Sequence, residues 1–497
     1  MSRARFALVA GAGVLVAGCT VGPDFVAPTV DAPSTFAESG DAPNAALDPA
    51  SLASWWRLLG DPVLDDLADR AVAGNLDLAI AEERVREAKA QRGVVASEDK
   101  PQVNAAGDYA RVRPSSATGS GIPSQPDGGR DYFRVGFDAT WELDVAGRVR
   151  RAVESADATV QASIEARRDV LVSLLAEVAR NYVELRGFQL RLEYARQNRD
   201  LQADTLGLTQ TRFNAGLTSE LDVAQAEAQL AATDSAIPLL VEGERAAMYR
   251  IGVLLGENPE RTVPALVATQ PIPTGPSTID PGRPADLLVR RPDLRRAERV
   301  AAAACAQIGV AEADLYPRVF LLGNVGWSAE DAGKLFGTSS FEWGIGPSVT
   351  WRIFDGGRIR SNIEVQDARF QETMLDYQRQ VLLAFEEVER SLLRHRTERE
   401  RITSIEQAVD ANQRALALSK ERYERGIGDF LSVLTAERNL LLAEDELASS
   451  QQDVTTALVA VYKALGGGGE AGSGEEPGSV LGSESDSPDS AVPTRAG

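Results

Sequence analysis

The chain has 497 residues and a formal net charge of −21, because 73 Asp and Glu outnumber 52 Lys and Arg. This acidity argues against nucleic acid as a partner, since neutralising phosphates needs a basic surface. The only cysteines, Cys19 and Cys305, exclude a disulfide framework, and a single histidine, His395, leaves almost nothing for histidine-based metal or triad chemistry.

The first residues have the pattern of a secretory signal peptide. Two early arginines precede an apolar stretch, Phe6 to Val16, that is too short to span a bilayer as a helix. This stretch runs into Leu15-Val-Ala-Gly-Cys19, which resembles the bacterial lipobox, in which the cysteine is acylated and becomes the mature N-terminus. A plain signal peptide with an incidental cysteine is the alternative.

The lipobox sets the expected boundaries of the N-terminal region. We expect a signal peptide over 1–18 and a lipidated segment over 19–62 that begins with acylated Cys19. Inner-membrane lipoproteins carry Asp at the position that Thr20 occupies here. Sorting to the outer membrane is therefore expected.

The rest of the chain contains one unit twice. Each residue between Trp141 and Gly256 aligns with the residue 210 positions later, and no gap is needed in this alignment. Upstream of this stretch the two copies match at an offset of 216 residues. We expect repeat 1 over 63–256, a linker over 257–285 and repeat 2 over 286–466. Matched pairs include Gly93 and Gly309, Trp141 and Trp351, Gly147 and Gly357, Arg212 and Arg422, Gly216 and Gly426, and Glu227 and Glu437.

Long helices are expected in both repeats. Leu64 to Glu98 has apolar residues at helical spacing, and Gly147 to Phe213 and its copy Gly357 to Tyr423 contain no proline. Each long helix would measure roughly 100 Å, at 1.5 Å per residue. Gly216 and Gly426 follow the two ends, where glycine supplies a left-handed turn, and a second helix then returns. Helices of this length usually form coiled coils.

Strands are expected between the helices of each repeat. Residues 131–143 and 341–353 alternate apolar with polar side chains and carry aromatic residues towards their ends, as transmembrane β-strands do. Weaker partner strands are expected at about 102–112 and 318–328. A soluble half-buried hairpin has the same alternation and is the alternative. Four strands cannot close a barrel, so membrane strands would have to be shared between subunits, with twelve in a trimer.

The C-terminal stretch has a different composition. Residues 467–497 are rich in Gly, Ser, Glu, Asp and Pro and poor in apolar residues. Such a stretch cannot bury enough surface to fold. We expect a disordered tail there.

Four motifs resemble those of the TolC-like outer-membrane factors, in the lipoprotein branch that serves tripartite efflux pumps of the resistance-nodulation-division type. The motifs are Cys19-Thr-Val-Gly-Pro-Asp-Phe25; Trp55-Trp56 before Asp61-Pro62; Arg290-Arg-Pro-Asp-Leu294; and Tyr423-x-x-Gly426 leading to Leu431-Ser-Val-Leu-Thr-Ala436. The resemblance covers Cys19 to about Gly466. It implies a mainly α fold with membrane β, in which four strands per chain contribute to a trimeric 12-stranded β-barrel. This barrel continues into a long periplasmic α-helical barrel.

The same resemblance implies a function. The protein would be the outer-membrane exit duct of a tripartite system that exports drugs or other small toxic compounds. Its partners would be two further copies of itself, a periplasmic adaptor, an inner-membrane transporter and outer-membrane lipid. Type I protein secretion uses the same duct architecture and stays open as an alternative, as does a lipid-anchored periplasmic coiled-coil scaffold. No cofactor, metal or enzymatic activity is predicted, because the sequence lacks a nucleophile elbow, a metal-ligand cluster and a glycine-rich phosphate loop.

The resemblance also assigns a gate at the periplasmic end. Asp222 and Tyr423 match its hydrogen-bonded positions, although Asp222 near a helix start is equally well explained as a cap. Ser432 and Thr435 stand where some members narrow the mouth with acidic residues, and Asp429, one turn earlier, can partly replace that charge. The arginine that locks the gate in some members is replaced by Gly428.

Docking of the adaptor is assigned to the two helix-turn-helix tips. These are Phe213 to Leu221 and Tyr423 to Leu431. The residues at the turns are Gly216 and Leu217 in the first repeat and Gly426 and Ile427 in the second.

Overall fold

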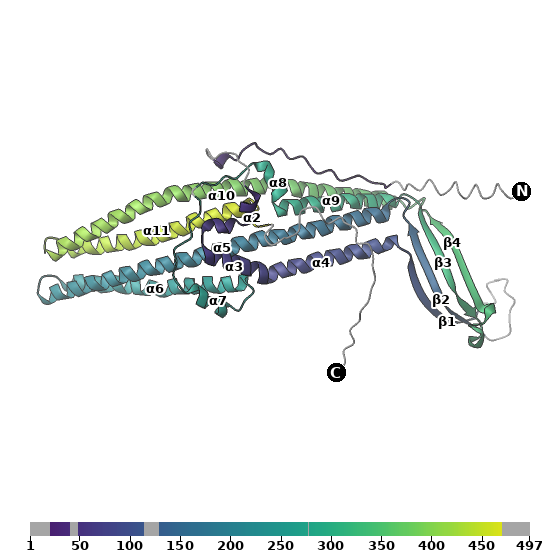
Figure 1. The fold of residues 1–497 in the computed structure, drawn as a ribbon, viewed down its shortest axis with the longest axis horizontal. Coiled ribbons are helices and arrows are strands. Elements are labelled where there is room, and N and C mark those ends of the chain that lie inside the picture. The colour runs from purple at the N-terminus through teal and green to yellow at the C-terminus, as the bar shows by residue number, and fades with distance from the viewer. Residues whose placement is uncertain (1–19, 40–47, 114–128, 277, 470–497) are drawn as a thin grey trace.

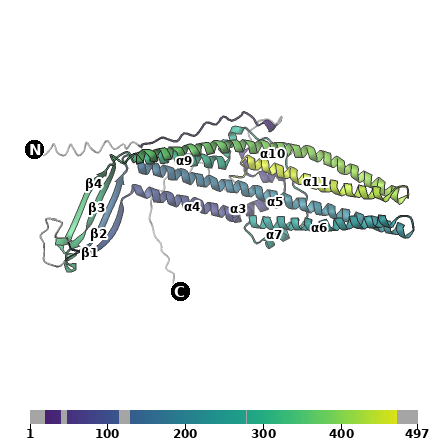
Figure 2. The same ribbon diagram turned by 180° about the vertical axis from the view of Figure 1, so that it is seen from behind.

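The computed structural model describes residues 20–39, 48–113, 129–276 and 278–469. The expected signal peptide, Cys19 and residues 470–497 of the expected tail lie outside the described residues. The molecule is elongated: long helices run along its length, the sheet is at one end and two helical hairpins form the other end (Figure 1). The view from behind shows the same arrangement (Figure 2). None of the described helices is both long and apolar enough to cross a bilayer.

The two repeats contribute the same elements in the same order. Short helices come first, at Pro49–Ala53 (α2) and in 3-10 form at Ala37–Ser39 and Trp55–Leu59. Repeat 1 comprises α3 (Pro62–Gly74), α4 (Leu76–Ala96), β1 (Gln102–Val112), β2 (Arg130–Leu143), α5 (Arg148–Asn214) and α6 (Glu220–Leu254). Repeat 2 comprises α8 (Leu287–Arg290), α9 (Pro292–Ala313), β3 (Arg318–Ala329), β4 (Phe341–Thr350), α10 (Arg358–Glu424) and α11 (Phe430–Ala464). The mainly α fold with four strands is therefore confirmed.

The region between the repeats contains a helix of its own. Within the expected linker, α7 (Pro259–Leu266) begins after Asn258, whose side chain accepts a hydrogen bond from the amide of Glu260 and so caps the helix. Helix α7 packs on α6 near the middle of the molecule (Figure 1). The linker thus contributes a packed helix to the middle of the molecule, which we call the equator.

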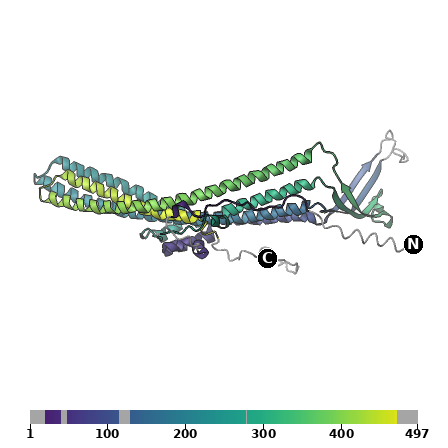
Figure 3. The ribbon, with the colours of Figure 1, turned by 90° about the horizontal axis from the view of Figure 1, so that it is seen from above.

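The long helices α5 and α10 have 67 residues each and connect the sheet to the hairpin tips. Near the sheet α10 diverges from α5 and α9, whereas near the tips the four helices α5, α6, α10 and α11 run together (Figure 3). Helix α5 packs along α9 near the sheet and along α6 and α11 towards the tips. Each repeat therefore supplies one antiparallel hairpin to the far end.

The four strands form one antiparallel sheet in the order β1-β2-β3-β4. The register places the apolar sets of all four strands on one face, because Phe137 pairs with Val325 and Val325 pairs with Trp343. On β4 this face is open, with Trp343 and Ile345 each 70% exposed. The opposite face carries Arg134, which forms ion pairs with Asp138 and Glu342. One face thus suits hydrocarbon and the other suits water.

Strand β4 is shorter than expected. The sequence predicts a strand over 341–353, but β4 ends at Thr350, which pairs with Arg318 at the start of β3. The next residue, Trp351, would lie opposite Pro317, which has no N–H to donate to a ladder. The pairing therefore stops there.

Two tryptophans in equivalent positions mark the boundary between sheet and helices. The indole N–H of Trp141 donates to the carbonyl of Asp99 and that of Trp351 donates to the carbonyl of Leu315, both at 2.9 Å. Asp99 and Leu315 are themselves equivalent at the offset of 216. The internal repeat thus extends to individual hydrogen bonds. Tryptophan is typical of a membrane–water interface, where one side of the ring is apolar and one atom needs a polar partner.

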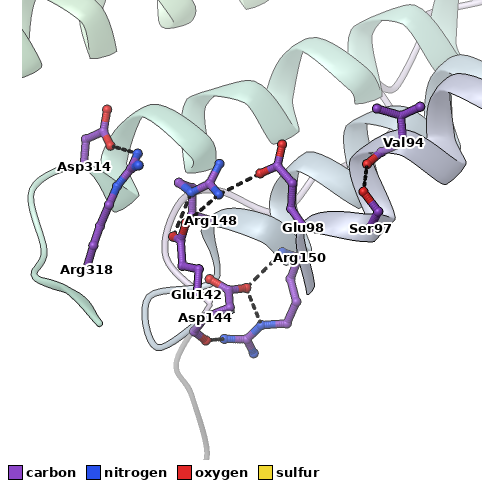
Figure 4. Close-up of polar contacts among 9 residues, drawn as sticks. All are labelled: Val94, Ser97, Glu98, Glu142, Asp144, Arg148, Arg150, Asp314 and Arg318. Carbon is purple, nitrogen blue, oxygen red and sulfur yellow. Dashed lines mark hydrogen bonds and ion pairs between the residues drawn. The ribbon is translucent and has the colours of Figure 1, made fainter. Parts of the chain in front are cut away.

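The junction between sheet and helices is pinned by arginines. Arg148, at the start of α5, donates to Glu142 at the end of β2 and to Glu98 after α4, at 2.8 to 3.0 Å (Figure 4). In the second repeat Arg318 of β3 donates to Asp314 at 2.6 Å. These contacts fix the angle at which the strands leave the helices.

Two apolar cores hold the helices together. The larger core lies at the equator, where Trp55, Leu64, Tyr182 and Ile251 are fully buried. The smaller core lies in the hairpin of α10 and α11 towards its tip. The expected disordered tail is wrong for its first three residues, because Gly467 to Gly469 are buried; a Cβ on Gly467 would lie 2.7 Å from the Trp55 ring.

Candidate functional site

The two hairpin tips have the same geometry. Gly216 and Gly426 both adopt φ of +73°, and the next amide in each turn donates back to the carbonyl of an equivalent arginine, Leu217 to Arg212 at 2.9 Å and Ile427 to Arg422 at 3.0 Å. Such turns need a residue that tolerates positive φ, which is why glycine occupies both positions.

Apolar side chains are exposed at equivalent places on both tips. Leu217 is 66% exposed and its counterpart Ile427 is 65% exposed, and Leu221 and Leu431 one turn later are also open. Leucine and isoleucine at such exposure leave an apolar surface without a partner in the protomer. The residues expected to dock the adaptor are therefore exposed at equivalent positions of the two tips.

Asp222 is the third residue of α6 and belongs to a capping box with Ser219. Its carboxylate accepts hydrogen bonds from the Thr218 hydroxyl and from the amide of Ser219, and its own amide donates to the Ser219 hydroxyl at 3.4 Å. Partial burial raises the pKa of Asp222, but the hydrogen bonds from Thr218 and Ser219 outweigh it and hold the pKa below its ordinary value. Asp222 is therefore an ionised helix cap.

Tyr423 is buried, and its hydroxyl has no hydrogen-bond partner among the described residues. Its ring packs against Phe430, with ring centres 5.7 Å apart, and the guanidinium of Arg212 lies 4.7 Å from the ring centre. The structure therefore does not join Asp222 and Tyr423 within one protomer. Their assignment to a gate stays a prediction.

Arg212 is the tip residue that the sequence analysis did not single out. It lies in the last turn of α5 and reaches the other hairpin, where it stacks on Tyr423 and donates to the carbonyl of Glu424 at 3.3 Å. Its counterpart Arg422 instead donates to the carbonyl of Ile427 in its own turn, at 3.5 Å. The sequence does not predict that the two arginines make different contacts, because this difference arises from how the two hairpins pack against each other.

Ser432 and Thr435 are exposed on one face of α11. The Ser432 hydroxyl donates to the carboxylate of Asp429, and the Thr435 hydroxyl donates to the carbonyl of Leu431 at 2.8 Å. The bond from Ser432 is the main reason why the pKa of Asp429 is lowered. Asp429 thus keeps a negative charge at the tip of the second hairpin, just before the two neutral residues.

Gly428 has little room for a larger residue. A Cβ at this position would lie 3.0 Å from the Cβ of Arg422 and 3.2 Å from the amide of Tyr423. An arginine there would require the turn to shift. The turn is therefore packed around a residue that has no side chain.

Above the tips, polar groups are buried between the two hairpins. Thr205 of α5 donates to Glu437 of α11 at 2.5 Å, and Asn198 donates to Glu444 at 2.6 Å. Gln202 lies between these pairs in sequence, and its side-chain amide has no partner among the described residues. Burial raises the pKa of Glu437, which the hydrogen bond from Thr205 and the charge of Lys420 only partly offset. We call Asn198, Gln202, Thr205, Glu437 and Glu444 the buried seam.

The described residues offer no suitable cluster of metal ligands. Across the described part of the chain, no group of three or more His, Cys, Asp and Glu side chains could hold a metal ion. His395, the single histidine, is buried in α10, and burial lowers its pKa to about 4.

Comparison with known proteins identifies the family. A family model described as outer membrane efflux protein matches residues 67–256 and 284–467, and thus both repeats. The chain belongs to this family. It is therefore an outer-membrane efflux channel, whose long helices form the periplasmic part.

Individual members of the outer membrane efflux family match over nearly the whole chain. The pyoverdine export outer membrane protein OpmQ of Pseudomonas aeruginosa is 33% identical over 427 residues, which are 85% of this chain and 88% of that protein. The toluene efflux pump outer membrane protein TtgI of Pseudomonas putida is 30% identical over 92% of this chain and 96% of its own length. The solved outer-membrane channel OprN is 35% identical, with a TM-score of 0.84 over 91% of this chain and 100% of that chain.

Proposed function

We propose that this efflux channel acts as a trimer and forms the exit duct of a tripartite pump, together with a periplasmic adaptor and an inner-membrane transporter. The sheet carries this proposal. It has one continuous apolar face and ends at β1 and β4, whose outer edges are unpaired within the described chain. An edge in hydrocarbon leaves backbone groups unsatisfied, so edge pairing between copies is the stable arrangement.

Three copies give a barrel of suitable size. Pairing β4 of one copy with β1 of the next produces twelve strands, which is within the range of bacterial outer-membrane barrels. The helices attached to the sheet would then form a second, helical barrel of roughly 100 Å, given 1.5 Å of rise per residue. Cargo would pass from the tips to the cell exterior without entering either leaflet.

We propose small organic molecules as cargo. OpmQ is named for pyoverdine export and TtgI for toluene efflux, and both match this chain over most of their length. The inner-membrane transporter would choose the molecule. Protein cargo, as in type I secretion, would need the same architecture and stays the alternative.

The gate is proposed at the tips. Each protomer supplies one Asp429 carboxylate, and its Arg212 joins the two hairpins. Three copies would bring three such pairs of hairpins together around one mouth. The Tyr423 hydroxyl, which has no hydrogen-bond partner in the described part of the protomer, is then available to a neighbouring copy once the ring moves.

The deciding experiment measures mass in detergent and single-channel conductance in a planar bilayer on the same purified protein. A trimer with a small conductance that increases in Asp222→Ala or Tyr423→Phe supports the gated duct. A monomer that gives no conductance would overturn the proposal and favour a lipid-anchored scaffold. Complementation of a pump-deficient strain then separates small-molecule efflux from protein secretion.

A further inference from the structure

The first described residues, Thr20 to Asp24, are held in a groove at the junction of sheet and helices. Arg151 of α5 is 3% exposed and donates from Nε to the carbonyl of Val21 at 2.9 Å. Its Nη2 donates to the carbonyl of Gly22 at 3.0 Å and to the carboxylate of Asp24 at 2.8 Å. The amide of Val21 donates in turn to the carbonyl of Ala146 at 3.1 Å. A buried guanidinium thus binds the main chain of this segment.

The groove fits this segment closely. A Cβ added to Gly147 would lie 2.8 Å from the Cα of Thr20, and one added to Gly309 would lie 2.9 Å from the carbonyl oxygen of Val21. A Cβ on Gly22 itself would lie 2.4 Å from the Cα of Gly309. Contacts this short leave no space for a side chain, so glycine is required on both sides of the groove.

The groove contains residues from both repeats. Ala146, Gly147 and Arg151 belong to repeat 1, whereas Cys305 and Gly309 lie on α9 of repeat 2. The thiol of Cys305 is buried and points at the carbonyl of Pro23, with Sγ 3.7 Å from the oxygen. The segment therefore joins the two repeats at the level of the junction.

The equivalent positions elsewhere in the repeat do not form such a groove. The counterpart of Arg151 is Ser361, and a Cβ on Gly93 or Gly357, the counterparts of Gly309 and Gly147, would meet nothing within 4 Å in the described chain. The internal repeat alone therefore does not produce this site. The N-terminal segment and Arg151 make it specific to one junction of the two.

We propose that this groove is a dock for the N-terminal segment, that Arg151 is its positioning residue, and that it fixes Thr20 at the boundary between sheet and helices. Trp141 and Trp351 mark the same boundary. An acyl group on Cys19 would then enter the membrane beside the strands. Only this last step rests on the proposed function; the dock itself is made by protein contacts.

Further along, the same segment is held a second time. The amides of Ala37 and Glu38 donate to the carboxylate of Glu389 on α10, at 2.7 and 3.0 Å. Between the two contacts the segment runs along the helices from the sheet end towards the equator (Figure 1). Release of the dock would therefore free one end of the segment without detaching all of it.

Cys305 is a natural reporter of the dock, because Pro23 covers its thiol. The test is alkylation of Cys305 by N-ethylmaleimide in the full-length protein, followed by peptide mass mapping that separates it from Cys19. We expect labelling about tenfold faster or more in Gly147→Ala and Gly309→Ala, since overpacking a tight contact of this kind favours the open state. In Gly357→Ala and Gly93→Ala, their matched controls, the rate should stay at the wild-type value.

The controls separate the dock from general damage. Gly147 and Gly357 have φ of +84° and +91°, so alanine strains the backbone equally at both, but only Gly147 contacts Thr20. Equal labelling rates in each matched pair would overturn the proposal. If either glycine variant fails to fold, Arg151→Lys and Asp24→Asn test the same contacts, and a wild-type rate in both would also overturn it.

A lipid-free variant completes the test. Cys19→Ser should keep slow labelling of Cys305, because the dock requires no acyl group. Fast labelling in Cys19→Ser would show that the lipid, not the groove, holds the segment, and would overturn the inference. Absence of channel conductance in the wild-type protein would instead overturn the proposed function and leave the alkylation result unchanged.

Discussion

Arg212 and Arg422 occupy equivalent positions in the two repeats, yet they contact different parts of the molecule. Arg212 reaches from the first hairpin to the ring of Tyr423 and the carbonyl of Glu424 in the second, whereas Arg422 closes its own turn. The glycines after each arginine predict the turns from the sequence. The contact across hairpins cannot be predicted in this way, because it depends on the angle at which the two hairpins pack.

Arg212→Gln should therefore make the closed mouth easier to open. The substitution removes a cation–π contact, which is worth about 0.5–1 kcal/mol at exposed sites, and so shifts an open–closed equilibrium roughly two- to fivefold. The measurement is the open probability of single channels in a planar bilayer. Arg422→Gln is the matched control and should change it less; equal effects of the two variants would contradict a role specific to Arg212.

The buried seam lies where α5 of one hairpin packs on α11 of the other. Glu437 is 2% exposed, forms no ion pair within the described chain and accepts a hydrogen bond from Thr205. Burial of an acid that forms no ion pair favours its protonated form. The sequence marks Glu437 only as the repeat partner of Glu227, which is exposed. Burial at one copy and exposure at the other arise from packing between repeats.

The contact between α5 and α11 should strengthen as the pH falls. The pKa of Glu437 is raised in the native protein above its ordinary value of 4.5, so the native state binds more protons than the unfolded state in the window above 4.5. Stability then decreases as the pH rises through that window and stays lowered above the raised pKa. Hydrogen exchange of the α5 amides near Thr205, measured against pH, reports this change.

Glu437→Gln should remove this pH dependence and slow exchange at neutral pH, because the amide keeps a hydrogen-bonding group without a charge. Glu227→Gln is the matched control, since Glu227 is the exposed counterpart. A pH dependence that persists in Glu437→Gln would assign it to another group. Lys420 on α10 is the charged group that bears on Glu437 and should be retained in both variants.

The strands show which features of the sheet can be predicted from the sequence and which cannot. Alternation of apolar and polar residues identifies β2 and β4, because the period of two is set by backbone geometry alone, whereas β1 and β3 give a weaker signal and are expected as their partners. The end of β4 is missed because it depends on Pro317 in a different strand. Likewise, Gly467 and Gly468 pack against Trp55, more than 400 residues away, and composition contains no information on that contact.

For the whole molecule, the two ends carry different surfaces for different partners. The sheet end exposes a continuous apolar face with tryptophans at its boundary, whereas the tips expose four isolated apolar side chains at equivalent positions of the two hairpins. The equatorial core and the long helices hold these ends apart. Changes at the tips should therefore affect docking of a periplasmic partner without affecting assembly in the membrane.

Leu217→Glu combined with Ile427→Glu should abolish efflux in cells while the purified protein keeps its oligomeric mass and conductance. Both side chains are about two-thirds exposed, so a carboxylate costs the protomer little, but it would be desolvated against an apolar partner. Bulky or charged residues at Gly216 or Gly426 should also uncouple docking, although there the positive φ adds backbone strain. Val289→Glu, 74% exposed at the equator, is the control and should retain efflux. Normal efflux in the double variant would show that the tips are not the docking surface.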